Sequence, residues 1–221
     1  MTAARTSTHS AAKSREDSRT AQRILKAAEA LFSEHGYDGA SMNAIAKRAG
    51  VSKANVFHHF PTKNGLYLAV LSHCCSRGDE LVQALDSSEG NVVERLRTFA
   101  REHLNFVLKQ DHISRLIARE LLKNRPKRAE ELAQQIFGRN FERIVSVLRN
   151  AQAQGEIRRE IDPAAVAVLL IAADVFYFQS RAMLRHLPHA QFSHEPQRYT
   201  DTLLDIIFYG ALTSRAHKAD K

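Results

Sequence analysis

The sequence predicts an all-α protein with a small N-terminal helical domain and a larger C-terminal helical domain. Apolar residues recur every three or four positions in successive segments, and no segment sustains the alternation of apolar and polar residues that marks a strand. Two short helix patterns meet at Gly50, whereas the patterns after residue 62 are longer and are separated by polar breaks. With 221 residues, the chain can bury a full core without a disulfide or a structural metal.

The first part of the chain is expected to hold an arm and one helix. Residues 1–18 are rich in Ser, Thr, Ala and charged residues without an apolar stripe, which predicts a mobile arm. From residue 19 apolar residues recur on one face, and Gly36 favours a helix end. Residues 37–39 then predict a turn. The shared face contains Ile24, Ala28, Leu31, Phe32 and His35.

The segment from residue 41 to residue 63 predicts a helix-turn-helix. Ser41 can cap a first short helix, and Gly50 permits the left-handed backbone that closes it. Ser52 can cap a second helix, which ends before Pro61. The inward-facing residues of the two helices are Met42, Ile45, Ala46, Ala49, Val56 and Phe60.

The second of these helices leaves Lys53, Ala54, Asn55, Phe57 and His58 on its outer side. Small, basic and amide side chains at the start of a helix can reach base edges and phosphates in the major groove of DNA. The alternative is an ordinary helical hairpin inside a core, because the same apolar spacing and glycine turn occur in many all-helical proteins.

The distribution of charge favours DNA as the partner. The formal net charge is +8, and residues 1–63 hold ten Lys and Arg against five Asp and Glu. The excess of positive charge therefore coincides with the helix-turn-helix, where it would attract phosphates and make binding depend on salt. The alternative is a charged surface that serves only solubility.

Six further helices are expected in the C-terminal part. They span residues 62–85, 91–109, 112–124, 128–154, 163–185 and 197–214, with a loop at residues 186–196. Thr62 can cap the first of them, and Asp162 with Pro163 predicts the start of the fifth. We therefore expect an arm at residues 1–18, a helix-turn-helix domain at residues 19–65 and a second domain at residues 66–215.

Sites of several other kinds are disfavoured. Cys74 and Cys75 are neighbours on a helix and cannot easily bridge, so idle thiols are favoured over a redox sensor. The adjacent His58 and His59 point in different directions and make a poor chelate. Three further histidines share one loop without a Cys or acidic pair at ligand spacing, so no metal site is expected. These are His186, His189 and His194.

The sequence also favours a cytoplasmic protein without enzymatic activity or a cofactor. The N-terminus carries no apolar leader, so export is not expected. Residues 163–178 are apolar but shorter than the ~20 residues of a membrane span, and Asp174 interrupts them. No nucleophile elbow, phosphate loop or metal-spaced cluster is present.

The run from Ile24 to Lys63 resembles the TetR family of transcriptional regulators. The first helix ends near a Phe-x-x-x-Gly-Tyr pattern, followed by Ile-Ala-x-x-Ala-Gly-Val-Ser, an aromatic-x-His-Phe pattern and Thr-Lys. The matching residues are Phe32, Gly36, Tyr37, Ile45, Ala46, Ala49, Gly50, Val51, Ser52, Phe57, His59, Phe60, Thr62 and Lys63. Beyond these roughly forty residues, only the helical layout is similar.

The resemblance implies a homodimer that places two recognition helices in successive major grooves of a palindromic operator. A C-terminal domain would bind a small ligand, which usually spreads the DNA-binding heads apart. The family's DNA-facing positions correspond here to Met42, Ser52, Lys53, Ala54, Phe57, His58, His59 and Lys63, and Asn55 is added from geometry.

Two of these positions depart from the family pattern. Phe57 stands where many relatives have Tyr, so a phenol bond to phosphate is lost. Its ring would pack against sugar or a thymine methyl, or would face the core. Ala54 replaces a frequent Gly, which makes the approach to the DNA backbone slightly less close.

The last two helices resemble the family's dimerisation pair. Two apolar stripes would be buried across a two-fold axis, although an internal core is an alternative. The candidate dimerisation residues are Val166, Leu169, Leu170, Ala173, Leu203, Leu204 and Ile207.

Asp174 interrupts the first of these stripes and needs a partner, such as an Arg or a hydroxyl, if it is buried. It would either fix a ligand or pair across the dimer. A guessed ligand pocket comprises His103, Phe106, Arg119, Glu120, Phe137, Phe141, Asp174, Tyr177 and Phe178, although most of these residues would look the same in a closed core.

The leading hypothesis is a dimeric regulator, more readily a repressor than an activator, that a small and largely apolar ligand releases from its operator. The alternative is a DNA-bound structural or interaction protein with the same head, a filled C-terminal core and no small-molecule ligand.

Overall fold

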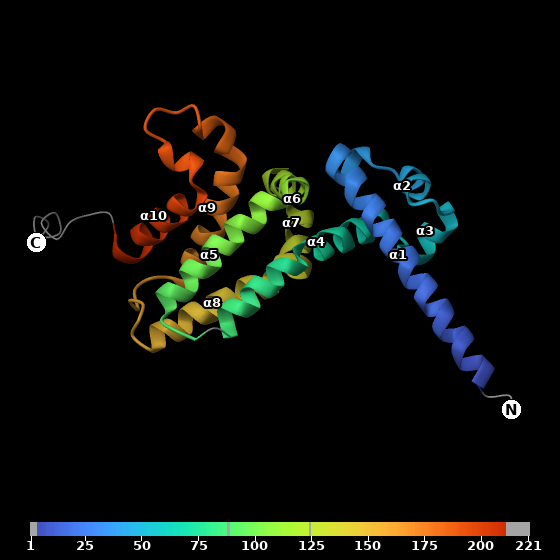
Figure 1. Cartoon of the computed structure of the whole chain (residues 1–221), viewed down its shortest axis with the longest axis horizontal. Helices are drawn as coiled ribbons and strands as arrows, with labels where there is room; N and C mark the ends of the chain where they lie inside the picture. Colours follow the sequence, from blue (N-terminus) through green and yellow to red (C-terminus); the bar gives the residue numbers. More distant parts are fainter. Residues whose placement is uncertain (1–3, 88, 124, 211–221) are drawn as a thin grey trace, which may run out of the picture. The chain divides into compact units, whose positions relative to one another are not determined.

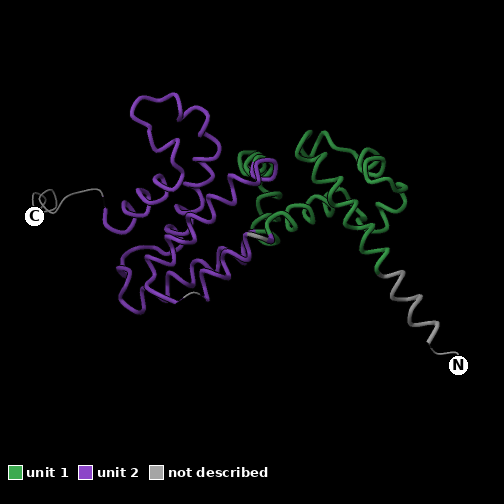
Figure 2. Tube along the Cα trace, viewed as in Figure 1, with its two compact units in different colours: residues 1–75, 115–136 green, residues 76–114, 137–221 purple. Residues whose placement is uncertain are grey.

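The computed structural model describes residues 4–87, 89–123 and 125–210, with the backbone alone for residues 4–14 and 77. Within these residues every regular element is a helix (Figure 1), which confirms the all-α prediction. The predicted ends of the last helix at residue 214 and of the second domain at residue 215 lie outside the described residues. The chain divides into two compact units, which Figure 2 shows in different colours.

The first unit runs to Cys75 and also includes residues 115–136. Its helices are α1 (Ala4–Gly39), α2 (Met42–Ala49), α3 (Lys53–His59), the first part of α4 (Lys63–Ser87), most of α6 (Asp111–Lys123), α7 (Pro126–Leu132) and most of the π-helix η1 (Ala133–Phe137). α1 packs against both α2 and α3, and α2 packs against α3. The buried residues of this bundle include Ile24, Phe32, Ile45 and Val56, as their spacing predicted.

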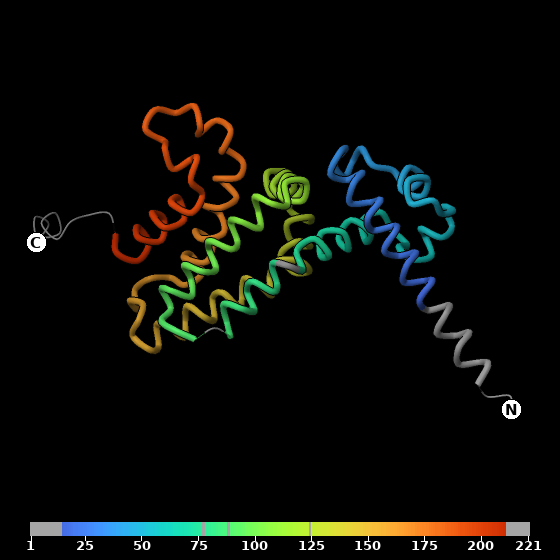
Figure 3. Tube along the Cα trace, in the orientation of Figure 1, coloured from blue at the N-terminus to red at the C-terminus, as the bar shows by residue number. Residues whose placement is uncertain are grey.

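The second unit holds the rest of α4 and the remaining helices, which can be followed in Figure 3. They are α5 (Val92–Lys109), α8 (Gly138–Ala153), α9 (Pro163–Leu184), the 3₁₀ helix η2 (Gln191–His194) and α10 (Pro196–Tyr209). α5 packs against α8, α9 and α10, and α8 also packs against α9. Their apolar faces meet in a core that includes Leu96, Ile144, Leu148, Leu170 and Leu204.

The local signals that predicted the helix ends are confirmed. The hydroxyl oxygens of Ser41 and Ser52 accept backbone N–H bonds at 3.1 Å. Thr62 accepts one from Gly65 at 2.9 Å, and the carboxylate of Asp162 accepts one from Ala164 at 2.8 Å. Each bond satisfies a donor that the first turn of a helix would otherwise leave unpaired.

Three features differ from the expectation. α1 extends back to Ala4 instead of starting at residue 19, and no Gly or Pro interrupts residues 4–18 to stop it. The single helix expected over residues 128–154 is divided into α7, η1 and α8. The two units also do not divide at residue 65, because residues 66–75 and 115–136 belong to the first unit.

α9 is the one described helix that is long and apolar enough to cross a membrane by length and composition. One side of it contributes Val166, Leu170 and Tyr177 to the interior of the second unit. An apolar helix that packs into a core passes the same test, so this feature is weak evidence for a membrane.

Candidate functional site

The turn between α2 and α3 is fixed from two sides. Gly50 has φ +64° and ψ +39°, a left-handed conformation that side chains rarely adopt. Arg23 of α1 donates from Nη2 to the carbonyl oxygen of Ala49 at 2.7 Å and to that of Gly50 at 3.1 Å. A Cβ at Gly50 would lie only 3.0 Å from this nitrogen. α1 therefore positions the turn from which α3 starts.

α3 presents a polar outer side. The side chains of Lys53, Ala54, Asn55 and His58 are exposed, whereas Val56 is fully buried. Phe57 is 39% exposed, and its ring lies 5.8 Å from Nζ of Lys53. Phe57 therefore does not face the core, which leaves contact with a partner as the other predicted role.

The remaining predicted DNA contacts flank α3 and are partly engaged within the unit. Met42 and His59 are half-buried, and the hydroxyl of exposed Ser52 is occupied by its capping bond. Nζ of Lys63 lies 4.6 Å from the centre of the Tyr37 ring and 3.4 Å from the carbonyl oxygen of Asp38. The Lys63 ammonium group is thus close to the helix-turn-helix, but these contacts make it less available to a phosphate than the ammonium group of Lys53.

Arg128 of α7 lies against the aromatic cluster of the same unit. Its guanidinium carbon is 4.7 Å from the centre of the Tyr37 ring and 5.1 Å from that of Tyr67. The guanidinium also donates to Asn64 at the start of α4 and lies 3.7 Å from the carboxylate of buried Glu120. Burial is the main reason why the pKa of Tyr67 is raised, and the nearby Glu120 raises it further. This polar cluster connects α4, α6 and α7.

The nine guessed pocket residues are divided between the two units. Arg119 and Glu120 belong to the first unit, where Nη1 of Arg119 lies within 3.0 Å of the position a Cβ at Gly36 would take. The other seven belong to the second unit. Tyr177 and Phe178 are buried there, and Phe106, Phe137 and Phe141 are half-buried.

Asp174 is hydrogen-bonded to a residue of α5. Its Oδ2 is hydrogen-bonded to Nδ1 of His103 at 2.7 Å, and the side chain of Asp174 is 1% exposed. Burial raises the pKa of Asp174, and the bond to His103 offsets part of that increase. Within the described residues its Oδ1 has no hydrogen-bond partner. The partner is a histidine of the same protomer, where the sequence had suggested an Arg or a hydroxyl.

The predicted dimerisation residues fall into two groups. Val166, Leu170 and Leu204 are already buried in the core of their own protomer. Leu169 is 54% exposed, and Ala173, Leu203 and Ile207 are half-buried. Phe176, Ile206 and Tyr209, which belong to the same predicted stripes, are also exposed, and the structure adds Val168 and Met183. Leu169, Phe176 and Met183 follow one another at intervals of seven residues, so they line one side of α9.

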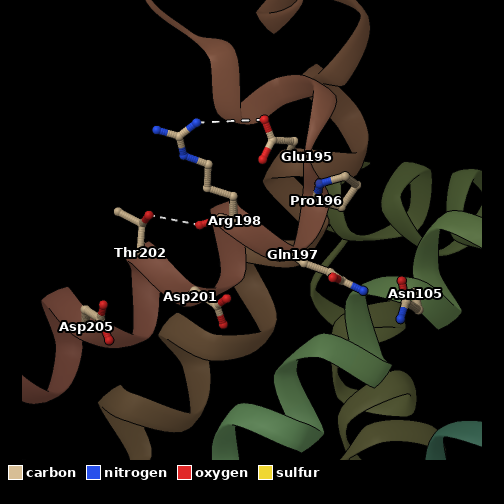
Figure 4. A pocket seen from close by; sticks show the side chains of 8 residues that line it. All are labelled: Asn105, Glu195, Pro196, Gln197, Arg198, Asp201, Thr202 and Asp205. Carbon is tan, nitrogen blue, oxygen red and sulfur yellow. Dashed lines mark hydrogen bonds and ion pairs between the residues drawn. The ribbon is translucent and has the colours of Figure 1, made fainter.

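A polar hollow of about 530 Å³ lies beside α10 (Figure 4), and its charged groups already have partners. Arg101 donates two hydrogen bonds to Asp201, at 2.8 and 3.0 Å, and Arg97 donates one to Asp205. The Arg101 side chain is the main reason why the pKa of Asp201 is lowered, with Arg97 adding to the effect. The four charged side chains that line the hollow, Glu195, Arg198, Asp201 and Asp205, are thus each paired with a described residue.

Cys74 is unsuited to redox sensing. The thiol is buried, and burial is the main reason why its pKa is raised to about 12. A thiol that stays protonated at neutral pH is a poor nucleophile.

The sequence did not identify Arg23 and Arg128 as residues that hold the first unit together. Arg23 meets the turn 26 positions further along the chain, and Arg128 meets Asn64 across 64 positions. Contacts over such separations leave no periodic signal in a single sequence.

Comparison with known proteins agrees with the geometry in both units. Residues 24–70 match the profile of "Bacterial regulatory proteins, tetR family", and residues 93–206 match that of "Tetracyclin repressor-like, C-terminal domain". The second match alone spans more than half of the chain.

Two curated relatives match the N-terminal part. The transcriptional repressor AcnR of Corynebacterium glutamicum is 38% identical over 76 residues, which are 34% of this chain and 38% of AcnR. The transcriptional activator FasR of Mycolicibacterium smegmatis is 38% identical over 102 residues, which are 46% of each chain. The chain thus matches less than half the length of either relative.

Among solved structures, FadR of Bacillus subtilis in complex with stearoyl-CoA superposes with a TM-score of 0.71. The match covers 86% of this chain and 99% of FadR at 15% sequence identity, so it establishes a common fold and not a common ligand.

Proposed function

Because the chain belongs to the TetR family of bacterial transcriptional regulators, we propose that it is a homodimer that binds a palindromic DNA operator through α3. A small, largely apolar ligand in the second unit releases it. The observation that carries the proposal is the helix-turn-helix itself. Gly50 and Arg23 fix its turn, Val56 is buried behind α3, and Lys53, Asn55 and Phe57 remain exposed.

In this proposal α3 lies in the major groove. Lys53 meets phosphate or a guanine edge, Asn55 meets an adenine edge and Phe57 packs against sugar or a thymine methyl. Lys63 contacts phosphate from the start of α4. The remaining contacts come from Met42, Ser52, Ala54, His58 and His59.

Dimerisation is supported by the exposed apolar side of α9 and α10. Leu169 and Phe176 are more than half exposed in the isolated protomer, and an apolar surface of this kind marks an interface. A two-fold axis between two such surfaces would pair two copies of α3, as a palindrome requires.

We infer repression as the direction of control, because a protein bound at an operator blocks polymerase without further contacts. The relatives named above include both a repressor and an activator, so the direction of control varies among them. We also expect the protein to be cytoplasmic, since it must reach DNA. We expect no enzymatic activity, since the proposed role needs only binding.

Selection of duplexes from a random pool by the purified protein tests the proposal. We expect enrichment of an inverted repeat whose half-sites lie about 10 bp apart or at a multiple of that distance, followed by a gel shift that is specific for it. A pool that shows no enrichment after repeated rounds contradicts the proposal. A selected operator that no small molecule releases would instead favour a DNA-bound structural protein.

A further inference from the structure

The second unit contains a groove between α4 and α5 that none of the roles above uses. Its volume is about 180 Å³. Leu81, Ala84 and Leu85 of α4 and Phe99 of α5 form its apolar walls. The groove has room for a short alkyl chain or a single aromatic ring, and apolar walls favour such a group over water.

The rim of this groove is acidic. Glu89, Glu94 and Glu102 line it together with one cation, Arg95, so three negative charges face one positive charge. Arg95 is held by the end of α4, because its Nε and Nη2 donate to the carbonyl oxygen of Leu85 at 3.1 and 2.6 Å. None of the three carboxylates forms an ion pair with any described residue.

The unpaired carboxylates distinguish this groove from the polar hollow beside α10. In that hollow Asp201 and Asp205 bind arginines, and Glu195 lies 3.8 Å from Arg198. A cation that approached the hollow would have to displace a partner that is already in place. At the α4–α5 groove the cation would displace only water from the carboxylates, because they form no ion pair with a described residue.

The aromatic wall of the groove is held in place from behind. Phe99 is stacked on the ring of His103, with centroids 5.6 Å apart and planes 18° apart. His103 is fixed in turn by its hydrogen bond to buried Asp174. A preorganised aromatic side chain beside carboxylates is the combination that recognises organic ammonium ions.

We propose that the α4–α5 groove is the effector site and that the effector is an amphipathic organic monocation, an alkyl or aryl ammonium. The apolar part lies against Leu81, Leu85 and Phe99, and the cationic end faces Glu94 and Glu102. An acyl-CoA thioester fits poorly, because it would bring several negative charges to an acidic rim. This inference rests on the proposed ligand-responsive function and specifies the class of ligand.

Calorimetric titration of the full chain at low salt tests the class of ligand with three eight-carbon probes. These are octyltrimethylammonium, octanoate and octanol, each below its aggregation limit. We expect one octyltrimethylammonium site per chain, with an affinity at least tenfold higher than that for octanoate. Equal or tighter binding of octanoate or octanoyl-CoA overturns the proposal.

Two variants test the location of the site. The double variant Glu94→Gln/Glu102→Gln should bind the cation about tenfold more weakly and octanol unchanged, because each exposed carboxylate contributes about a threefold attraction. Glu142→Gln, an exposed substitution on α8, is the matched control and should bind like the wild type. Unchanged cation binding by the double variant refutes the site.

Gel shifts with the selected operator separate this inference from the proposed function. Release of the operator by octanoyl-CoA but not by octyltrimethylammonium overturns the inference and leaves the function standing. If no operator is bound at all, the proposed function fails, while the calorimetry still decides whether the groove binds cations.

Discussion

Lys53 at the start of α3 is freer to meet DNA than Lys63 at the start of α4. Lys53 is exposed on the first turn, where its Nζ lies 5.8 Å from the centre of the Phe57 ring, whereas Lys63 is half-buried over Tyr37. The exposed position of Lys53 was predictable from the sequence, because Lys53 directly follows the Gly50 turn and the Ser52 cap and so lies on the first turn of the second helix. The partial engagement of Lys63 was not predictable, because Tyr37 lies 26 positions away in the sequence.

Replacing Lys53 by Ala should weaken operator binding about tenfold, because a major-groove contact is typically worth about 1–3 kcal/mol. Lys63→Ala should weaken binding less and flatten the slope of log affinity against log salt by about one. Fluorescence anisotropy between about 50 and 200 mM salt measures both quantities. Lys109→Ala, exposed in the second unit, is the control; wild-type affinity in both test variants would argue against the predicted interface.

Asp201 gives a prediction about pH. Arg101 and Arg97 lower its pKa below the usual value of 3.8, so its contribution to stability is fully present above that pH and disappears as the pH falls through the lowered pKa. Asp201→Asn should therefore cost about 0.5–1 kcal/mol at pH 7, discounted for partial exposure. The difference from the wild type should stay constant down to about pH 5 and shrink below about pH 4.

Urea unfolding at several pH values measures this difference. Asp205→Asn is the milder control, because Asp205 is more exposed and its one ion pair within the described residues is with Arg97. If the difference in unfolding free energy between the wild type and Asp201→Asn grew as the pH fell, the lowered pKa of Asp201 would be contradicted.

At the scale of elements, the sequence predicted what local chemistry determines. The caps at Ser41, Ser52 and Asp162 and the glycine turn at Gly50 each follow from residues a few positions apart. The division of the helix over residues 128–154 and the place of α6 and α7 in the first unit were not predictable. They depend on long-range contacts, such as those of Arg128 with Asn64 and Glu120.

The cluster around Arg128 should stabilise the first unit. Arg128→Met leaves the carboxylate of Glu120 buried without this partner, and we expect a loss of about 2–3 kcal/mol. Adding Glu120→Gln should recover part of that loss, because it removes a buried charge that then faces only Lys123, at 3.6 Å, among the described residues. Urea unfolding of the two single variants and the double variant measures the coupling.

Arg125→Met is the matched control, because Arg125 is exposed and, among the described residues, pairs with Asp38 alone. Its unfolding midpoint should not change measurably. Additive losses in Arg128→Met and Glu120→Gln would mean that the two side chains act independently.

At the scale of the whole molecule, the proposed regulation requires two copies of the chain. The helical layout and the apolar stripes of α9 and α10 predicted an interface. The spacing of the apolar residues does not show, however, which of them are buried within one protomer and which remain exposed for a second copy. The structure makes that distinction, since Leu170 is buried and Phe176 is 62% exposed.

Phe176→Glu should convert the dimer into a monomer, because two charged side chains would then be buried near a two-fold axis. Operator affinity should fall at least about 100-fold, since a monomer reads only one half-site. Analytical ultracentrifugation gives the mass of the variant. Leu122→Glu, which is 77% exposed on α6, should remain dimeric; a dimeric Phe176→Glu would place the interface elsewhere.

The most direct test is competitive anisotropy of the full chain on its selected palindrome, at about 0.15 M salt and against random duplex. We predict one dimer per palindrome and a preference of at least about 10³ over random DNA. Equal affinity for both duplexes, or saturation with a single chain, would contradict a paired protomer that reads DNA through α3.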